Sequence, residues 1–391
     1  MNVRSQPFLL CMGTRPEIIK MAPVYHELTR RGAAVALLHT GQHKDLAEPM
    51  YDFFDMRPDY SLHLNRSADT LEHLSALLIE KIGQVIVSTL PRAVLVHGDT
   101  TSALMAAMAA FYQKIKVAHV EAGLRSHNAY DPFPEEKNRE LIARIARWHF
   151  APTAQAAANL QREGIAERAI HVVGNTVIDA VAMGQKRLAE NADFAKTPNG
   201  LPAEHLHGRR VILVTAHRRE NWDGPLLSVA KAVLAIVHEH PDVVVVWPVH
   251  ANPSVKKTVH SVLGKLPPSL AHRVFLIHPL PYPAMLDLLS KSWLVMTDSG
   301  GIQEEAVGLH VPILVLRETT ERPELIDVGA GRLVGTNHEA IIKEVRGLSH
   351  NAHDYQRMRS VRNPFGDGTA ARQIVDALLN RESSATSPMP L

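Results

Sequence analysis

One stretch decides the fold of this chain: Trp293-Leu294-Val295-Met296-Thr297-Asp298-Ser299-Gly300-Gly301-Ile302-Gln303-Glu304-Glu305-Ala306. Its apolar start predicts a buried strand, its two glycines a tight turn, and its end the beginning of a helix. The free N–H groups and positive dipole end of such a helix form an anion site, which glycine lets a phosphate approach closely. Glu305, about one turn into the helix, is placed to accept hydrogen bonds from paired sugar hydroxyls. The stretch predicts a nucleotide diphosphate site, although an ordinary strand-to-helix turn explains it equally well when it is taken alone.

The composition indicates an ordinary two-domain protein. The chain has 391 residues, enough for two domains, and 46% of them are hydrophobic. With 42 basic and 40 acidic residues the net charge is +2, so we expect neither a nucleic-acid nor a membrane partner. No apolar run approaches the roughly 20 residues of a transmembrane helix, and the run 8–12 is too short for a signal peptide. We therefore expect a cytoplasmic protein.

The residue types give no sign of a metal or a cofactor. The single cysteine, Cys11, excludes an internal disulfide and fits a reducing compartment, and its apolar surroundings indicate a core residue. The 23 histidines form no closely spaced metal-ligand pattern. No P-loop is present, and no G-x-G-x-x-G follows the first apolar run, so we expect no nicotinamide cofactor.

The first half alternates short apolar runs with amphipathic helices, which predicts a parallel sheet covered by helices. We expect strands at 8–12, 35–39, 93–97, 116–120 and 148–151. Ligands of such sheets bind beyond the carboxyl ends of the strands. Each of the first four runs is followed by glycine with polar or charged residues, and these segments should open on one edge: Gly13-Thr14-Arg15-Pro16-Glu17, Thr40-Gly41-Gln42-His43, Gly98-Asp99-Thr100-Thr101 and Glu121-Ala122-Gly123-Leu124-Arg125.

A second strand–helix series, from 211–214 to 313–316, predicts another parallel-sheet domain. The fold class is therefore α/β, with two Rossmann-like domains facing across a cleft, the usual place for a small-molecule site. We expect an N-terminal domain over 1–173 and a C-terminal domain over 174–364. A helix within 365–380 should pack back across the first domain, and 381–391 should form a disordered tail.

Charged residues at the strand ends indicate proton transfer. Asp99, Glu121 and Glu135 are expected to converge from the first domain, with His217 facing them from the second. Neighbouring carboxylates repel, so at least one should be protonated, which gives acid and base forms in one pocket. A structural reading of Glu135 is that acidic residues stabilise helix N-termini. Positive charge for a diphosphate would come from Arg15, Lys20, Arg218 and Arg322.

Several motifs in register carry a resemblance to a known family. They are GTRPE (13–17), HGDTT (97–101), HVEAGLR (119–125), PEEKNR (134–139), AHRREN (216–221), DSGGIQEE (298–305) and TTERPE (319–324). In this order they resemble the non-hydrolysing UDP-N-acetylglucosamine 2-epimerases of bacteria, from about Phe8 to the last helix. The resemblance implies a fold of the GT-B type, usually as a homodimer. It also implies interconversion of UDP-GlcNAc and UDP-ManNAc without an added redox cofactor, to supply sugars for surface polysaccharide.

The family's functional residues can be carried over position by position. The resemblance implies catalytic roles for Asp99, Glu121, Glu135 and His217. The implied chemistry is removal of the C2 proton with loss of UDP, a 2-acetamidoglucal intermediate, and re-addition of UDP. The uracil contacts fall near Leu280 and Met285, and because members often have an aromatic residue at the latter position, Tyr282 is an alternative. The implied nucleotide contacts are Arg15, Lys20, Arg218, Ser299, Gly300, Gly301, Glu305 (on the ribose) and Arg322.

Many bacterial members bind a second UDP-GlcNAc as an activator. Asp45 stands where those members usually have glutamine, and the arginine expected near Ala68 is absent. Activation by substrate is therefore a hypothesis, which a hyperbolic rate curve would count against. The matching positions are Gln42, His43, Glu136, Arg218 and His250.

Other functions stay open at this point. A hydrolysing relative would release UDP and free ManNAc, and another relative would act on a diacetamido sugar nucleotide. A GT-B glycosyltransferase binds a UDP-sugar in the same way, although no acceptor surface is obvious. A sugar-nucleotide sensor without catalysis is the non-enzymatic alternative, and the intact set of carboxylates argues against it. Which carboxylate serves which face of C2 also stays open.

Overall fold

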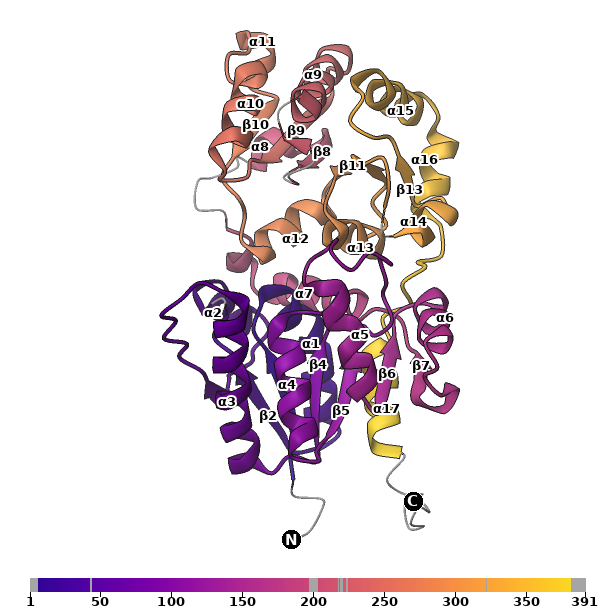
Figure 1. The fold of residues 1–391 in the computed structure, drawn as a ribbon. Helices are drawn as coiled ribbons and strands as arrows, with labels where there is room; N and C mark the ends of the chain where they lie inside the picture. The colour runs from indigo at the N-terminus through magenta and orange to yellow at the C-terminus, as the bar shows by residue number, and fades with distance from the viewer. Residues whose placement is uncertain are drawn as a thin grey trace. The chain divides into compact units, whose positions relative to one another are not determined.

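The apolar runs of the sequence become the strands of two parallel sheets, one in each half of the chain (Figure 1). The computed structural model describes residues 6–380 except 43, 197–202, 217, 219–220, 223 and 321. Two units are present: the first contains Met1–Met183 and Phe365–Leu391, and the second contains Gly184–Pro364.

The first sheet has the strand order β3-β2-β1-β4-β5-β6-β7. The order reverses between β1 and β4, so polar side chains that follow these two strands meet at a switch point, where parallel sheets bind ligands. Every residue of β1 and of β4 is buried. The strands are β1 (Phe8–Met12), β2 (Val35–His39), β3 (Tyr60–Ser61), β4 (Ala93–His97), β5 (Lys116–Val120), β6 (Trp148–Ala151) and β7 (Ile170–Val172).

Helices cover this sheet through apolar side chains that alternate along each strand. Leu9 and Cys11 of β1 share one apolar core with residues of α3 and α4, which confirms Cys11 as a core residue. The helices of the first unit are α1 (Arg15–Arg30), α2 (Lys44–Phe53), α3 (Leu71–Thr89), α4 (Thr101–Tyr112), α5 (Glu135–Ile145), α6 (Ala154–Arg162), α7 (Thr176–Glu190, which continues into the second unit) and α17 (Ala370–Asn380), with the short η2 (Glu167–Ala169).

The second sheet has the order β10-β9-β8-β11-β12-β13. Its strands are β8 (Arg210–Thr215), β9 (Val243–Pro248), β10 (Val274–Ile277), β11 (Leu294–Thr297), β12 (Ile313–Val315) and β13 (Gly331–Leu333). Its helices are α8 (Ala203–Leu206), α9 (Gly224–Glu239), α10 (Pro253–Leu263), α11 (Pro268–Ala271), α12 (Tyr282–Ser290), α13 (Gly300–Gly308), α14 (Pro323–Asp327), α15 (His338–His350) and α16 (Ala352–Arg359), with η3 (Ala192–Ala195). The stretch 293–306 is thus a strand, a turn and a helix, as expected.

The boundary between the units lies later than expected. We placed it after residue 173, but the first unit continues into α7 as far as Met183. The reason is that the start of α7 is tied to the returning segment, since Asp179 Oδ1 accepts the backbone N–H of Ala371 at 3.0 Å. Helix α17, yellow in Figure 1, lies in the first unit and contacts α1. The expected tail, 381–391, falls outside the described residues, and no helix in the described part could span a membrane.

The position of β8 in the middle of its sheet gives a test of the fold. Leu213 of β8 is fully buried, whereas Leu333 of the edge strand β13 is 40% exposed. We expect Leu213→Ala to lower the free energy of unfolding by about 2–5 kcal/mol, because it leaves a cavity. Leu333→Ala is the matched control and should cost about 1 kcal/mol or less. Urea unfolding followed by circular dichroism measures both, and equal losses would contradict the central placement of β8.

Candidate active site

A buried carboxylate lies at the carboxyl end of β5, where Glu121 is the first residue after the strand. Lys20 of α1 forms a short ion pair with Glu121 Oε2, and the two side chains are 10% and 11% exposed. His97 Nε2, at the end of β4, lies 3.7 Å from the same oxygen. Asn175 Nδ2 donates a hydrogen bond to it at 3.0 Å. Two of the residues chosen from the sequence, Lys20 and Glu121, are therefore in direct contact.

The surroundings of Glu121 keep its carboxylate ionised. Burial favours the protonated form, but the nearby Lys20 and His97, and the hydrogen bond from Lys20, outweigh it and hold the pKa of Glu121 well below its usual range. We expected repulsion to keep at least one of the predicted carboxylates protonated. Glu121 is not that protonated carboxylate, because its nearest charged neighbour is a cation and not another carboxylate. For the set as a whole the expectation stays a prediction.

The backbone at Glu121 adopts a conformation that is uncommon for a residue with a side chain. Its φ is 61°, in the left-handed region, where non-glycine residues are found mainly at functional sites and tight turns. The facing turn carries Gly98, whose carbonyl accepts a hydrogen bond from His119 Nε2 at 2.7 Å. Burial lowers the pKa of His119 to about 3, so the ring is neutral and donates a single N–H. The two turns that carry Glu121 and Asp99 are thus held together.

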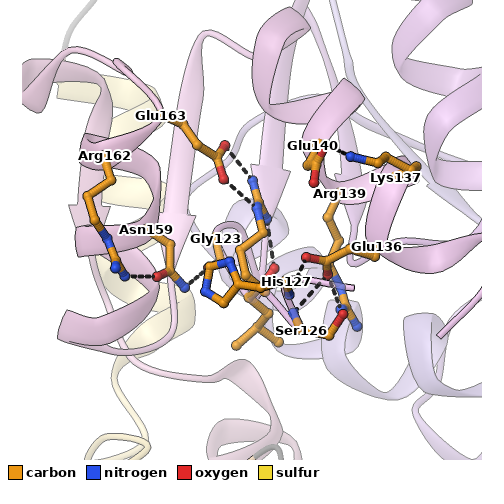
Figure 2. Close-up of polar contacts among 12 residues, drawn as sticks. Gly123, Ser126, His127, Glu136, Lys137, Arg139, Glu140, Asn159, Arg162 and Glu163 are labelled. Atoms are coloured by element: carbon orange, nitrogen blue, oxygen red, sulfur yellow. Dashed lines mark hydrogen bonds and ion pairs between the residues drawn. The ribbon is translucent and has the colours of Figure 1, made fainter. Parts of the chain in front are cut away.

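Asp99 is linked to α5 through Arg139. Arg139 Nη2 lies 2.5 Å from Asp99 Oδ2, and its other terminal nitrogen lies 3.2 Å from Glu136 Oε2. Glu136 also accepts the backbone N–H groups of Ser126 and His127, each at 2.9 Å (Figure 2). Burial works against ionisation of Glu136, but these two backbone donors and Arg139 lower its pKa. Glu136 therefore joins the Asp99 turn to the loop that follows Glu121.

Helix α6 holds the other side of this loop (Figure 2). Asn159 Nδ2 donates to the carbonyl of Gly123 at 2.9 Å, and Arg125 forms a two-pronged ion pair with Glu163 at 2.6 and 2.8 Å. Gly123 has a φ of 89°, and a Cβ there would lie 2.2 Å from the carbonyl oxygen of Ala156. Only glycine allows the backbone at position 123 to lie this close to Ala156. These contacts fix the loop that follows Glu121 in one position.

Glu17 is a structural carboxylate to which the sequence analysis gave no role. Its Oε2 accepts the backbone N–H groups of Gly13 and Thr14 at 2.8 and 2.7 Å, and its Oε1 accepts the hydroxyl of Thr100 at 2.7 Å. It thus ties the loop after β1 to the loop after β4, and burial raises its pKa. The signal that could have found it is Thr14-Arg15-Pro16-Glu17, a capping-box pattern. Arg15 in the same loop is exposed.

In the second unit, polar groups gather around the turn between β11 and α13. The buried Asp298 accepts the backbone N–H of Arg218 at 3.0 Å and Nδ2 of Asn221 at 2.9 Å. Arg322 pairs with Glu304, with Nε and Oε1 2.5 Å apart. A Cβ at Gly300 would lie 3.8 Å from this guanidinium. An arginine therefore lies beside the N-terminal end of α13, where the sequence predicted an anion site. Asn221, which contacts Asp298, and Glu304, which contacts Arg322, were not among the residues predicted from the sequence.

Three of the predicted nucleotide contacts lie at or near the start of α13. Ser299 is the residue before the helix, and Glu305 within it is 8% exposed. A Cβ placed on Gly301 would have no atom within 4 Å, so the space beside this residue is open. Leu280 and Tyr282 are buried at the start of α12, Met285 is half-buried one turn further on, and Glu135 is half-buried at the first position of α5. Gln42 accepts the hydroxyl of Ser102 at 2.7 Å, and His250 Nδ1 accepts the N–H of Asn252 at 3.2 Å.

His43 and His217 fall outside the described residues. Glu136 is 1% exposed, and its oxygens serve the loop and Arg139 as described above. Activation by a second substrate molecule therefore stays a prediction. Among the residues that the structure describes, no group of His, Cys, Asp and Glu side chains could hold a metal ion.

Known proteins resemble this chain over almost its whole length. The model of a family described as UDP-N-acetylglucosamine 2-epimerase matches residues 26–379. The UDP-N-acetylglucosamine 2-epimerase of Campylobacter jejuni is 40% identical over 380 residues, which are 96% of this chain and 98% of that protein. The protein of that name from Escherichia coli K12 is also 40% identical over 380 residues, 96% of this chain and 99% of that one.

A solved structure agrees with these matches. It is the UDP-GlcNAc 2-epimerase from Neisseria meningitidis bound to UDP-GlcNAc, with a TM-score of 0.84 and 38% identity. The similarity covers 96% of this chain and 100% of that one.

The Lys20–Glu121 pair predicts a pH-dependent loss of stability when the cation is removed. Glu121 has a lowered pKa in the folded state, so its ionised form stabilises the fold above its unfolded pKa, about 4.3, and this stability is lost as the pH falls through the folded pKa. In Lys20→Met the carboxylate stays buried without its cation, which should cost about 3–5 kcal/mol at neutral pH. The cost should shrink as the pH falls below about 4.3, because the carboxyl of the variant is then protonated and the wild type loses its own stabilisation as the pH falls through its lowered folded pKa.

Urea unfolding at a series of pH values measures this effect. The matched control is Lys186→Met, which removes an exposed lysine paired with Glu190 at 3.8 Å. That change should alter the free energy of unfolding by about 0.5 kcal/mol or less at every pH. A loss in Lys20→Met that is the same at pH 7 and at low pH would show that the pair with Glu121 does not cause it.

Proposed function

The chain belongs to the UDP-N-acetylglucosamine 2-epimerase family, and on that premise we propose that it interconverts UDP-GlcNAc and UDP-ManNAc without hydrolysing either. The resemblance in the sequence motifs is thereby confirmed, and so is the pair of Rossmann-like parallel-sheet domains of the GT-B type. The proposal extends to the product, the mechanism and the biological role, which is the supply of ManNAc-type sugars for surface polysaccharide.

The observation that carries the mechanism is the ionised Glu121 at the carboxyl end of β5. Epimerisation at C2 requires a base that removes the C2 proton while the C1–O bond to UDP breaks and its electrons leave with UDP. The product of this step is a 2-acetamidoglucal. A carboxylate that is ionised at neutral pH can accept a proton, although a low pKa makes it a weaker base than one whose pKa lies near the working pH. Glu121 therefore takes part in proton transfer, together with Asp99, Glu135 and His217.

The return step adds UDP to C1 and a proton to C2 from the opposite face. Two faces of one carbon require more than one proton-transfer group, which the set of carboxylates supplies. Arg139 holds Asp99 at 2.5 Å, so this carboxylate also has a fixed orientation. The glucal must be kept from water while it waits for UDP, which is the reason to expect an enclosed site during turnover.

UDP is proposed to bind at the N-terminal end of α13. The Neisseria relative was solved with UDP-GlcNAc bound, and the helix end here offers N–H groups, two glycines and the neighbouring Arg322. Glu305 would accept hydrogen bonds from the ribose hydroxyls. The further contacts proposed for UDP are Arg15, Lys20, Arg218, Leu280, Tyr282, Met285 and Ser299.

The decisive experiment is proton NMR of the protein with UDP-GlcNAc in deuterated water. We expect UDP-ManNAc to appear with deuterium at C2 and with only traces of free UDP. Glu121→Gln and Asp99→Asn should each lower the rate by about 100-fold or more, because each removes a proton-transfer group. Glu140→Gln is the matched control, since this carboxylate pairs with Lys137 on the exposed side of α5 and should leave the rate unchanged.

Other outcomes would redirect the assignment. Free UDP and ManNAc in equal amounts would identify a hydrolysing enzyme. A substrate that binds but does not react would favour a diacetamido sugar nucleotide first, and then the glycosyltransferase and the sensor. Unchanged turnover in Glu121→Gln would remove Glu121 from the mechanism.

An exposed apolar face supports the proposed homodimer. Val87 and Leu90 at the end of α3 are 61% and 47% exposed, and Phe111 and Tyr112 at the end of α4 are 58% and 65% exposed. The two helices pack side by side, and Gln113 at the end of α4 donates to the carbonyl of Gly83 at 2.9 Å, about one turn before Val87 in α3. Exposed apolar groups gathered in this way mark protein interfaces.

Light scattering after size-exclusion chromatography tests this face. The wild type should elute with twice the chain mass of 43.2 kDa, and the double variant Phe111→Asp/Tyr112→Asp with the mass of one chain. Tyr130→Ser is the control, because Tyr130 is also exposed (80%) but lies in a loop away from the ends of α3 and α4 in the sequence. This variant should keep the mass of the wild type. A wild-type monomer, or a variant that stays dimeric, would contradict the proposed face.

A further inference from the structure

Asn175, directly before α7, is a buried residue that the proposed chemistry does not use. It is 3% exposed, and each of its polar groups has a partner in the first unit. Its backbone N–H donates to the carbonyl of Phe365 at 2.7 Å. Its side-chain oxygen accepts the N–H of Val177 at 3.0 Å, and its Nδ2 donates to Glu121 Oε2 at 3.0 Å.

The orientation of this side-chain amide follows from its partners. A backbone N–H only donates, so the group that faces Val177 is the amide oxygen. An ionised carboxylate only accepts, so the group that faces Glu121 is the NH₂. If the amide were flipped, its NH₂ would face the N–H of Val177 and its oxygen would face the carboxylate oxygen of Glu121, and neither pair could form a hydrogen bond. The hydrogen bond to Glu121 therefore has a fixed direction, and helix α7 holds the donor in place.

Asn175 lies in the first unit, before the chain leaves it after Met183 and beside Phe365, where the chain returns. Outgoing α7 begins at the next residue, and the returning segment begins at Phe365. The two segments cross in close contact, since a Cβ at Gly174 would lie 3.0 Å from the carbonyl oxygen of Phe365 and 3.3 Å from Cα of Gly366. Asn175 is thus held by the returning segment at Phe365 and by the start of α7.

We propose that Asn175 is a positioning residue for the Glu121 carboxylate, which it anchors to the contact between the segment before α7 and the returning segment at Phe365. The inference rests on the proposed function of Glu121. Three other groups face or influence this carboxylate: Lys20 from α1, His97 from β4 and Arg139 from α5. Lys20 and Arg139 are long, flexible side chains, and His97 Nε2 lies 3.7 Å from the carboxylate oxygen, farther than Asn175 Nδ2. Asn175 is a neutral donor whose position is set by its hydrogen bonds to Val177 and Phe365, so it fixes the orientation of the ionised Glu121 carboxylate.

The variant Asn175→Asp separates this role from helix capping. Aspartate caps a helix N-terminus as well as asparagine does, so the contact with Val177 is kept. The other oxygen replaces the NH₂ that donated to Glu121, and two carboxylate oxygens then face each other. We expect kcat to fall about tenfold or more, with KM for UDP-GlcNAc within about twofold, because the damage is to chemistry and not to binding. The acid limb of the kcat profile should move up by about one pH unit or more.

Asn337→Asp is the matched control. Asn337 caps α15 in the second unit through the N–H groups of Glu339 and Ala340, with no contact to Glu121. It should keep the wild-type kcat and pH profile. Wild-type kcat and profile in Asn175→Asp as well would overturn the proposal and leave Asn175 as a helix cap. If Asn175→Asp does not fold, Asn175→Ser keeps a capping oxygen without the amide and should lower kcat in the same way; a wild-type kcat there would also overturn the proposal.

A second measurement does not depend on activity. Carbon-13 NMR of protein labelled at the glutamate carboxyls follows the titration of Glu121, whose signal is assigned by its loss in Glu121→Gln. We expect its midpoint to rise in Asn175→Asp by about one pH unit or more and to stay in place in Asn337→Asp. A raised midpoint in a protein without epimerase activity would refute the proposed function but keep the contact. An active protein whose midpoint does not move would refute the positioning role alone.

Discussion

A carboxylate buried at the end of a strand must be compensated, and the first unit is arranged around this requirement. Glu121 lies in a left-handed turn after β5 and would carry a large desolvation cost if it stood alone. Lys20 supplies the opposite charge, and His97 and Asn175 face the same oxygen. These partners come from α1, β4 and the start of α7, so the compensation of one charge fixes the mutual positions of three elements.

Two further carboxylates of this unit are buried and have their oxygens satisfied by hydrogen-bond donors from the loops. Glu17 accepts backbone N–H groups after β1 and the Thr100 hydroxyl after β4, and Glu136 accepts backbone N–H groups after β5. Each buried carboxylate satisfies donors that no sheet or helix could satisfy. The acidic residues of the motifs therefore differ in what holds them. Glu17 and Glu136 accept loop N–H groups, whereas Glu121 and Asp99, to which we propose roles in proton transfer, face cationic side chains.

Two edge strands, the boundary between the units and the role of Asn175 could not have been predicted from the sequence. The edge strands β3 and β13 have two and three residues, too few to show an alternation of apolar and polar side chains. The boundary after Met183 lies inside a continuous helix, where no change of composition marks it. Asn175 looks like an ordinary cap before a helix. Its second contact, with Glu121, joins residues separated by 54 positions and has no local signature.

The sequence by itself determined the two parallel sheets, the strand–turn–helix at 293–306 and the family, because apolar periodicity, glycine turns and ordered motifs are properties of short segments. It also named Lys20 as a candidate nucleotide contact and Glu121 as a candidate catalytic carboxylate. Only the tertiary structure decided that these two pair with each other, across 101 positions of chain, and that Glu121 is thereby held ionised rather than protonated. The reason is that a charge responds to burial and to neighbours in space, and neither is encoded in the order of residues around it.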